Sequence, residues 1–408
     1  MNITLFDDKN RINLLPLTFT RPVGDLRVGI LTSTERWQKL AKQFSINATV
    51  SFKTQHYLST LFPANYGSDN LFINGGLITG EAGGREILNL EPGTALYFQN
   101  TLAAVRLNKQ EAETFSPDTY EPAQKKHLDP LQAVKIAAPH DIFMLNDKAI
   151  RWDFELLTKG RLSKKLSDTN RVLGAENVFV EESANVECAI LNGTTGPIYI
   201  GEDAEVMEAS AIRGPFALCE HSQLKLNTKV YGPTTVGPHS KVGGEVTRSM
   251  VMGYSNKGHD GFLGDSVLGY WCNLGADTNN SNLKNNYADV KLWDYETKRF
   301  KQTGLQFCGL IMGDHSKCGI NTMFNTGTVV GICANIFGAG FPRNFVPDFA
   351  WGGSQGFETY KPDKVFETAE LVYRRRGKNL TQEEKDVLNA VFEQTKEHRY
   401  WENKTAAS

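Results

Sequence analysis

Aliphatic residues recur at every sixth position through the middle of the chain. One run begins at Ile200 and continues through Val206, Ile212, Leu218, Leu224, Val230, Val236 and Val242. A second run keeps the same step through Met312, Cys318, Phe324, Val330 and Ile336. A helix repeats about every 3.6 residues and a half-buried strand every two, so a period of six indicates short strands joined by regular turns. The sequence therefore predicts a left-handed parallel β-helix of hexapeptide repeats, in which stacked turns bury one continuous apolar column.

The segment before the repeat has a different pattern. Residues 1–165 mix helical stretches, such as Ser33–Phe44, with short apolar runs, which indicates an α/β domain. Three of these runs are expected to be strands, at 71–74, 95–98 and 141–145. The β-helix is then expected over residues 166–340.

Residues 341–408 are expected to form a helical C-terminal extension. Asp363 heads one helical segment, and Thr381 with Glu384 forms a capping box at the head of another. Because a solenoid needs its open end covered, we expect this extension to be a cap without chemistry. Residues 352–356 match the G-x-S-x-G pattern of serine hydrolases, but they follow a proline-broken stretch and precede no helix, so we interpret them as a turn.

The repeat is expected to break at two places that lie close together along the chain. Six residues after Val242 comes Arg248, which cannot occupy a dry column without a partner, and the pattern resumes at Leu263. The pattern fails again at 279–305, a polar stretch that is too long for a turn. Insertions in repeat proteins commonly fall on the binding face. The two breaks therefore predict a single pocket.

The predicted pocket contains His259, which lies in the first break between a glycine and an aspartate. Its other polar residues are amides and cations, namely Asn273, Asn279, Asn280, Asn282, Arg248, Lys284 and Lys291. A neutral histidine is the commonest general base near neutral pH, and Lys and Arg bind phosphate oxygens. The combination fits deprotonation of an amine or hydroxyl on a phosphorylated substrate. The alternative for His259 is an exposed loop histidine without a role.

The composition excludes several classes of protein. The 408 residues include 44 Lys and Arg against 46 Asp and Glu, so the chain has no global basic field for nucleic acid. No apolar run approaches the roughly 18 residues that cross a bilayer, and the first residues carry aspartates where a secretory signal carries lysines. The six cysteines form no CxxC pair, which indicates reduced thiols. We expect a cytoplasmic enzyme that binds neither nucleic acid nor membrane.

The segment 257–284, KGHDGFLGDSVLGYWCNLGADTNNSNLK, is similar to the acetyltransferase domain of a known family. That family is the bacterial bifunctional glucosamine-1-phosphate acetyltransferase/N-acetylglucosamine-1-phosphate uridylyltransferase, which carries G-H-x-x-Y-x-G-D, then N-x-G-A-G-T, then a further asparagine. The resemblance implies acetyl transfer from acetyl-coenzyme A to an aminosugar phosphate in nucleotide-sugar biosynthesis. It also implies a homotrimer, because the active sites of the family lie between subunits.

The same resemblance implies roles for single residues. His259 falls on the family's catalytic base, and Phe262 falls on a substrate-binding tyrosine whose hydroxyl it lacks. Asn273 and Asn282 fall on asparagines of the sugar-phosphate and acetyl sites. The cations of the substrate pocket would be Arg248, Lys284 and Lys291. The contacts to acetyl-coenzyme A would come from Ala276, Gly319 and Ile320.

The N-terminal segment 15–29, LPLTFTRPVGDLRVG, resembles the P-L-T-x-x-x-P-K-P segment of sugar-nucleotide pyrophosphorylases. The resemblance implies that Arg21 and Arg27 bind the phosphates of UTP or another nucleoside triphosphate, with Mg²⁺ where the domain is active. The G-x-G-T-R loop of that family is replaced by DDKNRINLL, and a chain without glycines does not easily turn its amides onto an anion. An active nucleotidyltransferase domain and a degenerate one both stay open.

Other functions also stay open at this point. One is O-acetylation of a different sugar with the same histidine, and another is a non-catalytic regulatory scaffold that binds nucleotide sugars. His221 and His239 lie 18 residues apart, so three repeats per coil would stack them on one face. Zinc binding there lacks a third histidine in register and a paired carboxylate, and the metal content stays unknown.

Overall fold

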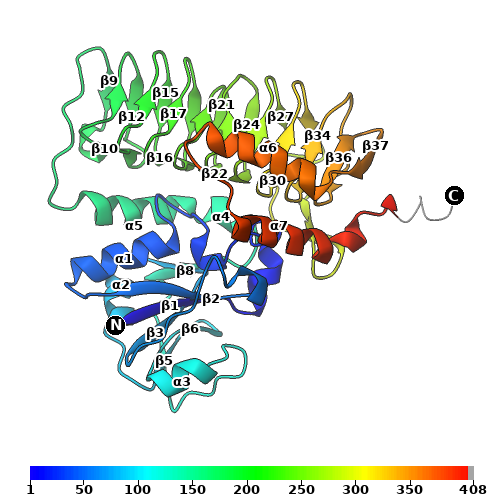
Figure 1. Cartoon of the computed structure of the whole chain (residues 1–408). Helices are drawn as coiled ribbons and strands as arrows, with labels where there is room; N and C mark the ends of the chain where they lie inside the picture. Colours follow the sequence, from blue (N-terminus) through cyan, green and yellow to red (C-terminus); the bar gives the residue numbers. More distant parts are fainter. Residues whose placement is uncertain (403–408) are drawn as a thin grey trace.

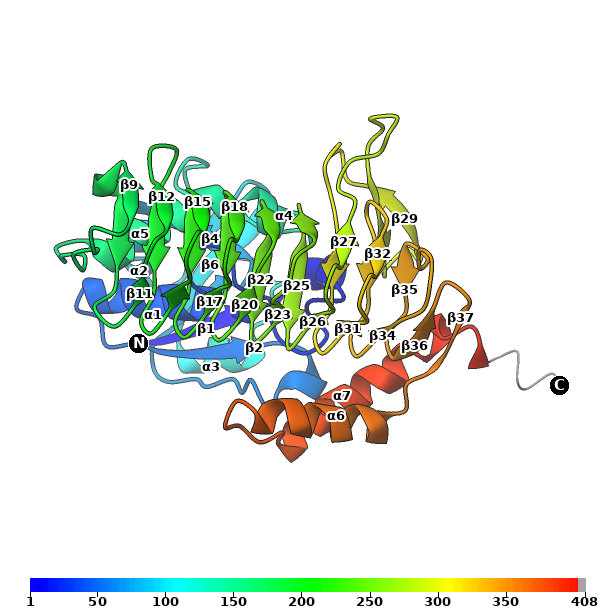
Figure 2. The ribbon, with the colours of Figure 1, turned by 90° about the horizontal axis from the view of Figure 1, so that it is seen from above.

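The computed structural model describes residues 1–402, and this part of the chain forms three connected units (Figure 1). An α/β domain carries the N-terminus, and a long parallel β-helix lies beside it. Two C-terminal helices lie along the side of the β-helix (Figure 2). The expectation of an α/β domain, a β-helix and a helical tail is confirmed.

The N-terminal domain is built on a mixed sheet with the strand order β2-β1-β3-β6-β5-β7. Its strands are β1 (Asn2–Phe6), β2 (Thr49–Lys53), β3 (Asn70–Asn74), β5 (Thr94–Phe98), β6 (Thr101–Leu107) and β7 (Gln124–His127). A separate antiparallel pair joins β4 (Leu77–Thr79) to β8 (Ala133–Lys135). The helices are α1 (Ser33–Gln43), α2 (Glu81–Leu88), α3 (Lys109–Thr114), α4 (Asp141–Met144) and α5 (Asn146–Thr158). The expected helix at 33–44 and the strands at 71–74 and 95–98 are confirmed.

The third strand expected in this domain is wrong. Residues 141–144 form helix α4, which begins where the Asp141 carboxylate accepts hydrogen bonds from the Ala137 and Ala138 amides. Ile142 and Phe143 are both completely buried. A short apolar run has the same pattern in a buried strand and in one buried helical turn, so periodicity could not separate the two.

The β-helix has three faces, which we name by what covers them. The packed face consists of β10 (Val178–Val180), β13 (Ile198–Ile200), β16 (Phe216–Leu218), β19 (Thr234–Val236), β22 (Met250–Gly253), β25 (Val267–Tyr270), β30 (Ile311–Met312), β33 (Val329–Val330) and β35 (Phe345–Val346). The groove face consists of β11 (Asn185–Val186), β14 (Glu205–Val206), β17 (Gln223–Leu224), β20 (Lys241–Val242), β23 (Asn256–Lys257), β26 (Asn273–Leu274), β31 (Lys317–Cys318), β34 (Asn335–Ile336), β36 (Ala350–Gly353) and β37 (Gly356–Thr359). The open face consists of β9 (Arg171–Leu173), β12 (Ile190–Asn192), β15 (Ala211–Arg213), β18 (Lys229–Tyr231), β21 (Glu245–Thr247) and β24 (Phe262–Gly264), and it continues as β27 (Asn279–Asn280) and β32 (Met323–Phe324).

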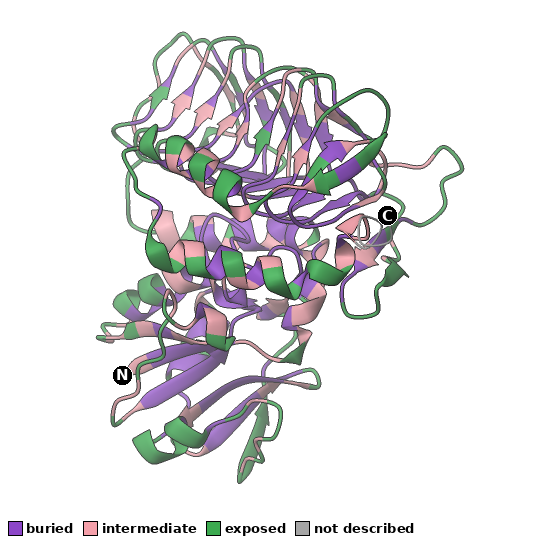
Figure 3. Ribbon diagram, turned by 45° about the vertical axis from the view of Figure 1, so that its right-hand side comes forward, coloured by how far each residue is buried: buried purple, intermediate pink, exposed green. Residues whose placement is uncertain are grey.

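The six-residue period places one apolar side chain per strand inside the β-helix. Every position of the two runs, Ile200 to Val242 and Met312 to Ile336, belongs to a single buried cluster. None of these side chains is more than 5 % exposed. Figure 3 shows buried segments of the ribbon in coil after coil along the β-helix. Neighbouring coils therefore stabilise one another through a shared core, as the period predicts.

The first expected break in the repeat is wrong, because the coil continues with shorter steps. The partners of Val230, Val236 and Val242 in the next coil are Val246, Val251 and Lys257. Arg248 lies at a corner between two of these strands with φ 41°, outside the column. A count in sixes loses the register here, although the three faces are preserved.

The second expected break is an insertion that folds back onto its own chain. Asn279 and Asn280 still belong to a coil, and the insertion that follows carries the hairpin β28 (Lys291–Asp294) and β29 (Arg299–Gln302). Within this hairpin, Trp293 stacks on Phe345 with ring centroids 4.3 Å apart. The Tyr295 hydroxyl donates a hydrogen bond of 3.0 Å to the Asp348 carboxylate. These contacts attach the hairpin to the last coils.

The N-terminal domain covers the outer side of the packed face. The strands of this face are buried at nearly every position, which is typical of a sheet that is covered on both sides. The chain segment after β1 supplies much of the cover, through Leu14, Leu17 and Phe19. These side chains share one cluster with Met250 and Ile311 of the packed face. The interface between the two units is therefore an apolar core.

The C-terminal helices do not cap the solenoid, so that expectation is wrong. Helix α6 (Pro362–Arg374) lies along the groove face, and α7 (Gln382–Gln394) adds Leu388 and Val391 to the core shared with the N-terminal domain (Figure 2). The last coil is covered by the β36–β37 hairpin, where Phe357 packs on Trp401. The coils thus reach Gly353, beyond the boundary expected at residue 340. The G-x-S-x-G stretch forms the turn of this hairpin, as predicted.

Candidate functional site

A row of glycines, which we call the glycine trough, runs along the groove face. Its floor is made of the residues that directly follow four successive inward positions, and all four are glycines: Gly243, Gly258, Gly275 and Gly319. The same register places Lys225 at one end of this row and Phe337 at the other. A Cβ atom at Gly258 would meet no atom within 4 Å, so this part of the floor faces open space. Coils about 4.8 Å apart make the floor about 14 Å long.

His259 lies beside this trough, at the turn between β23 and β24. Its side chain is exposed and lines a groove of about 710 Å³. The register that aligns the glycines also aligns the next residues, so His259, Ala276 and Ile320 form a second row. Asn273 lines the same groove. Four residues predicted for the site are therefore brought together in one groove.

A buried lysine supports the His259 turn from inside the β-helix. Lys257 occupies an inward position and is 2 % exposed. Its ammonium donates hydrogen bonds of 2.9 Å to the backbone oxygens of Gly243 and His259. Burial lowers the pKa of Lys257 from its ordinary value of 10.5 to about 8, although the carboxylates of Asp260 and Asp277 act in the opposite direction. The carbonyl of His259 is thus held by a side chain in the core.

Cations surround the groove, and several of them were not predicted. They are Lys225, Lys241 and Lys317 from the β-helix, with Arg375 and Arg376 at the end of α6. Over residues 1–402, none of these five forms an ion pair with a carboxylate. Burial lowers the pKa of Lys241, and nearby Arg376, Lys225 and Arg375 lower it further. The Glu205 carboxylate acts in the opposite direction on the pKa of Lys241, so the groove carries a positive charge that is only partly offset.

The other predicted substrate residues form a second group outside this groove. The Asp265 carboxylate accepts a hydrogen bond from Arg248 and another, of 2.6 Å, from the Asn282 side-chain amide. Phe262 packs beside them, near Gly264. The group lies at the corner between the open face and the packed face, on coils before and after the His259 turn. The side chains of Arg248 and Asn282 thus have a shared partner within the chain itself.

The two lysines of the insertion also lie outside the groove. The Lys284 ammonium donates a hydrogen bond of 2.6 Å to the Asp289 backbone oxygen. Lys291 is exposed at the start of β28. Within one chain, the three predicted cations, Arg248, Lys284 and Lys291, therefore lie outside the groove that contains His259.

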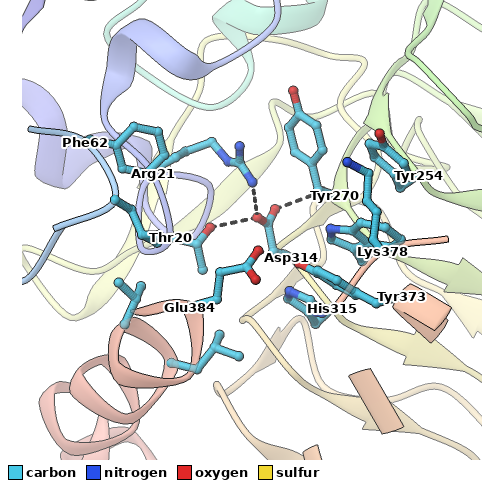
Figure 4. Close-up of a pocket in the computed structure, with 14 residues that line it drawn as sticks. Thr20, Arg21, Phe62, Tyr254, Tyr270, Asp314, His315, Tyr373, Lys378 and Glu384 are labelled. Carbon is cyan, nitrogen blue, oxygen red and sulfur yellow. Dashed lines mark hydrogen bonds and ion pairs between the residues drawn. The ribbon is translucent and has the colours of Figure 1, made fainter. Parts of the chain in front are cut away.

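The two arginines predicted to bind nucleotide phosphates have partners in the protein. Arg21 lines a cavity of about 290 Å³ at the junction of all three units, where its guanidinium lies 2.7 Å from Asp314 (Figure 4). The guanidinium also lies 2.8 Å from Asp25. Burial lowers the pKa of Arg21, but these carboxylates raise it above its ordinary value. Arg27 is 3 % exposed and pairs with Glu35. Arg21 thus joins the N-terminal domain to the β-helix, and Arg27 is paired within the N-terminal domain.

The stacking of His221 and His239 is confirmed, and the stack is longer than the sequence indicated. Their ring centroids are 4.7 Å apart, and the row continues through Tyr254 and Trp271. Tyr373 of α6 stacks on Trp271 at 4.1 Å. Among residues 1–402, no group of three or more His, Cys, Asp or Glu side chains could hold a metal ion. The stack therefore positions α6 beside the groove.

The arginines that α6 adds to the groove have a signal in the sequence. Residues 374–376 are three consecutive arginines, and a run of charge at a helix end is a recognisable signal. Its place in the fold has no local signal, because it depends on how α6 packs against the Tyr254–Trp271 stack. Lys225 and Lys241 belong to ordinary repeats, so only the register of the coils shows their alignment with the trough.

Comparison with known proteins supports the resemblance. Residues 3–162 match the family model described as sugar nucleotidyl transferase. A bifunctional sugar-1-phosphate nucleotidylyltransferase/acetyltransferase of Sulfurisphaera tokodaii is 30% identical over 172 residues, 42% of each chain. The chain resembles these bifunctional proteins.

Two further relatives carry the name bifunctional protein GlmU. The protein of Methanocaldococcus jannaschii is 36% identical over 87 residues, 21% of each chain. The protein of Synechococcus elongatus is 23% identical over 248 residues, which cover 55% of this chain and 50% of the relative. The matched segments therefore span at most half the length of these three relatives. In the described part of the chain, no helix is long and apolar enough to cross a membrane.

Proposed function

We propose that the chain transfers an acetyl group from acetyl-coenzyme A to the amine of an aminosugar phosphate, with His259 as the general base. The observation that carries this proposal is the glycine trough. It places an exposed histidine beside a row of glycines, where a ligand can come close to the backbone. The likeness to bifunctional nucleotidylyltransferase/acetyltransferases supports the same function.

The residues of the groove fit coenzyme A. Ile320 is 71% exposed and Ala276 lies in the same row, so an apolar edge faces the trough. The unpaired cations suit the phosphates of the cofactor or of the acceptor. Acetyl-coenzyme A supplies the activated acyl group.

The chain's own residues supply position and proton transfer. His259 would accept the proton from the sugar amine, which must be uncharged to attack the thioester carbon. Lys257 fixes the backbone of the His259 turn through its hydrogen bond to the His259 oxygen. Asn273 would orient the acceptor, since its amide is exposed in the groove next to this turn. Held in this geometry, the two reactants meet without the entropic cost of a bimolecular encounter.

We also propose a homotrimer that is formed through the open face. The packed face is covered by the N-terminal domain and the groove face by α6, and within residues 1–402 neither of these covers the open face. It exposes the apolar side chains of Leu173, Ile190 and Tyr231. Contact between copies there would supply the group around Asp265 to a neighbouring groove, so that Arg248, Phe262 and Asn282 would join His259 at one site.

For the N-terminal domain we propose binding of UTP or another nucleoside triphosphate. The support is the match of residues 3–162 to sugar nucleotidyl transferases. The carboxyl ends of β1 and β3 are the place where such sheets bind ligands, and Asp7, Asp8 and Asn74 lie there. The described residues offer no ready cluster for Mg²⁺, so we derive no step through a metal. Calorimetric titration with UTP tests this part, and absence of binding would leave the domain as a scaffold.

Two other functions remain as alternatives to N-acetylation. O-acetylation of another sugar would use the same histidine, and a panel of aminosugar phosphates against neutral sugars separates the two. A regulatory scaffold would leave the trough unused, and release of thiol from acetyl-coenzyme A excludes it. We place the protein in the cytosol, where both substrates are found, and the six free cysteines suit that compartment.

Replacement of His259 tests the proposed mechanism. His259→Ala should lower kcat by about 10²–10⁴-fold, the usual contribution of a general base, with little change in KM for acetyl-coenzyme A. His56→Ala, an exposed histidine of the N-terminal domain, is the matched control and should keep full activity. Thiol release with glucosamine-1-phosphate as acceptor measures both. Wild-type turnover in the His259 variant would remove this residue from the mechanism.

A further inference from the structure

The cations of the groove are concentrated on one side of His259. Lys241 pairs in register with Asn256, so it lies one coil before the strand that leads to His259. Lys225 is aligned with Gly243 and Gly258, so it lies two coils before the same point. At about 4.8 Å per coil, the two lysines are about 5 and 10 Å from the His259 coil along the axis of the β-helix.

The end of α6 adds two more cations on the opposite wall of the groove. Arg375 and Arg376 line it together with the two lysines, and the Arg376 guanidinium donates a hydrogen bond to the Asn256 side-chain oxygen at 3.3 Å. Burial lowers the pKa of Arg376, and the neighbouring Arg375 lowers it further. Four like charges that repel one another are costly to hold together, and an anion bound between them would remove that cost.

On the other side of His259 the groove has one cation, Lys317, whose ammonium donates a hydrogen bond of 2.9 Å to the His315 backbone oxygen, and the other residues that line it there are uncharged. The trough continues for two coils through Gly275 and Gly319 and ends at Phe337, which is 43% exposed. Ile320 lies along the same stretch and is 71% exposed. A long, weakly polar chain such as the pantetheine arm fits this side. The basic side then remains for the acceptor, whose amine and phosphate are joined to neighbouring carbons of one sugar ring.

We propose that the basic end of the groove, formed by Lys225, Lys241, Arg375 and Arg376, binds the diphosphate of a nucleotide-linked aminosugar. Two phosphates in series match cations that are spread over two successive coils and both walls, whereas a single phosphate would reach only the nearer ones. The inference rests on the proposed acetyl transfer and names its acceptor class. Acetyl transfer would then follow nucleotidyl transfer, because the acceptor must already carry its nucleotide.

A comparison of two acceptors tests this inference. Thiol release is measured with UDP-glucosamine and with glucosamine-1-phosphate, at equal concentrations of acetyl-coenzyme A. We expect kcat/KM to be at least tenfold higher for UDP-glucosamine, since one further charge-assisted contact contributes about that factor. A preference for glucosamine-1-phosphate, or equal use of the two, would overturn the diphosphate site and leave the proposed acetyl transfer intact. No thiol release with either acceptor would contradict the proposed function itself.

Paired substitutions identify the groups involved. The double variant Lys225→Met, Lys241→Met should raise KM for UDP-glucosamine by about 10²-fold and leave KM for acetyl-coenzyme A unchanged. The control Lys39→Met, Lys42→Met removes the same charge from the exposed side of α1 and should change neither constant. Calorimetry with UDP-glucosamine alone reports binding without turnover and should show the same loss. A rise confined to KM for acetyl-coenzyme A would assign the cations to the cofactor and overturn the proposal.

Discussion

Lys257 is the one charged side chain that the β-helix turns into its own column, and replacing it gives a direct test of the structure. In the register of the coils it is aligned with Val242 on one side and with Leu274 on the other. Lys257→Met keeps a long unbranched side chain in the column and removes the ammonium. The change also leaves the backbone oxygens of Gly243 and His259 without this donor.

The expected effect on the free energy of unfolding depends on pH. Burial lowers the pKa of Lys257 from 10.5 to about 8, a shift that corresponds to about 3 kcal/mol. Below pH 8 the amine is protonated in both states, and the folded protein carries the full cost of the buried charge. Between pH 8 and 10.5 the unfolded chain binds the additional proton, so the stability contributed by this group rises with pH. The wild type should therefore gain up to about 3 kcal/mol relative to the Met variant across this window.

Urea denaturation followed by circular dichroism at pH 7.5, 9 and 10.5 measures this gain. The control Lys165→Met removes an exposed lysine, and its stability should run parallel to that of the wild type across the series. A constant difference between wild type and Lys257→Met would show that the ammonium is not buried as described. If the wild type instead lost stability relative to the Met variant as the pH rises, the predicted direction of the pH dependence would be wrong.

Two further substitutions test the trough and the assembly. Gly258→Val projects a side chain into the groove without meeting another atom, so the melting temperature should stay the same while kcat/KM for acetyl-coenzyme A falls by about 10²-fold or more. Unchanged activity would show that the trough floor does not contact the cofactor. Tyr231→Glu places a charge on the open face and should convert a trimer to monomers in light scattering, whereas Leu131→Glu on the N-terminal domain should not. A wild type that is monomeric at micromolar concentration would exclude the trimer.

The period of six was enough to predict the core because each inward position is fixed locally. A coil of three short strands returns each repeat to the same face, so Leu224 and Val242 meet without any information from distant parts of the chain. The prediction failed where the step shortens after Val242, since a count in sixes then assigns Arg248 to the column. The period could not predict the inward position of Lys257 either, because the repeat was identified from aliphatic residues and a lysine does not fit that pattern.

The sequence predicted those parts of the candidate site that the register of the coils determines. His259, Asn273, Ala276 and Ile320 gather in the groove because parallel coils in register bring corresponding positions together. Arg248 and Asn282 were expected in the same pocket, but both lie at the corner between the open face and the packed face, where the Asp265 carboxylate accepts a hydrogen bond from each. The contribution of α6 depends on tertiary packing alone, and no pattern within residues 341–408 indicates which face of the β-helix it covers.

The N-terminal segment that follows β1 is held in the core between the N-terminal domain and the β-helix. Where a nucleotide-binding loop would need flexible backbone, this chain has Leu14, Leu17 and Phe19 packed into the core between domains. Moving that segment to cradle a phosphate would expose these side chains, and each buried apolar side chain of this size stabilises the fold by about 1.5–3 kcal/mol.

Arg21 fixes the same segment through its ion pair with Asp314, whose other oxygen accepts the Tyr270 amide of the packed face. Asp314 is followed by His315, where burial lowers the pKa to about 3, so the imidazole stays neutral beside the stack that positions α6. A ligand that displaced Arg21 would therefore leave Asp314 buried without its cation, next to the strand that carries Lys317 into the groove. Residues 314–317 therefore contact the N-terminal domain at one end, through Asp314, and the groove at the other, through Lys317.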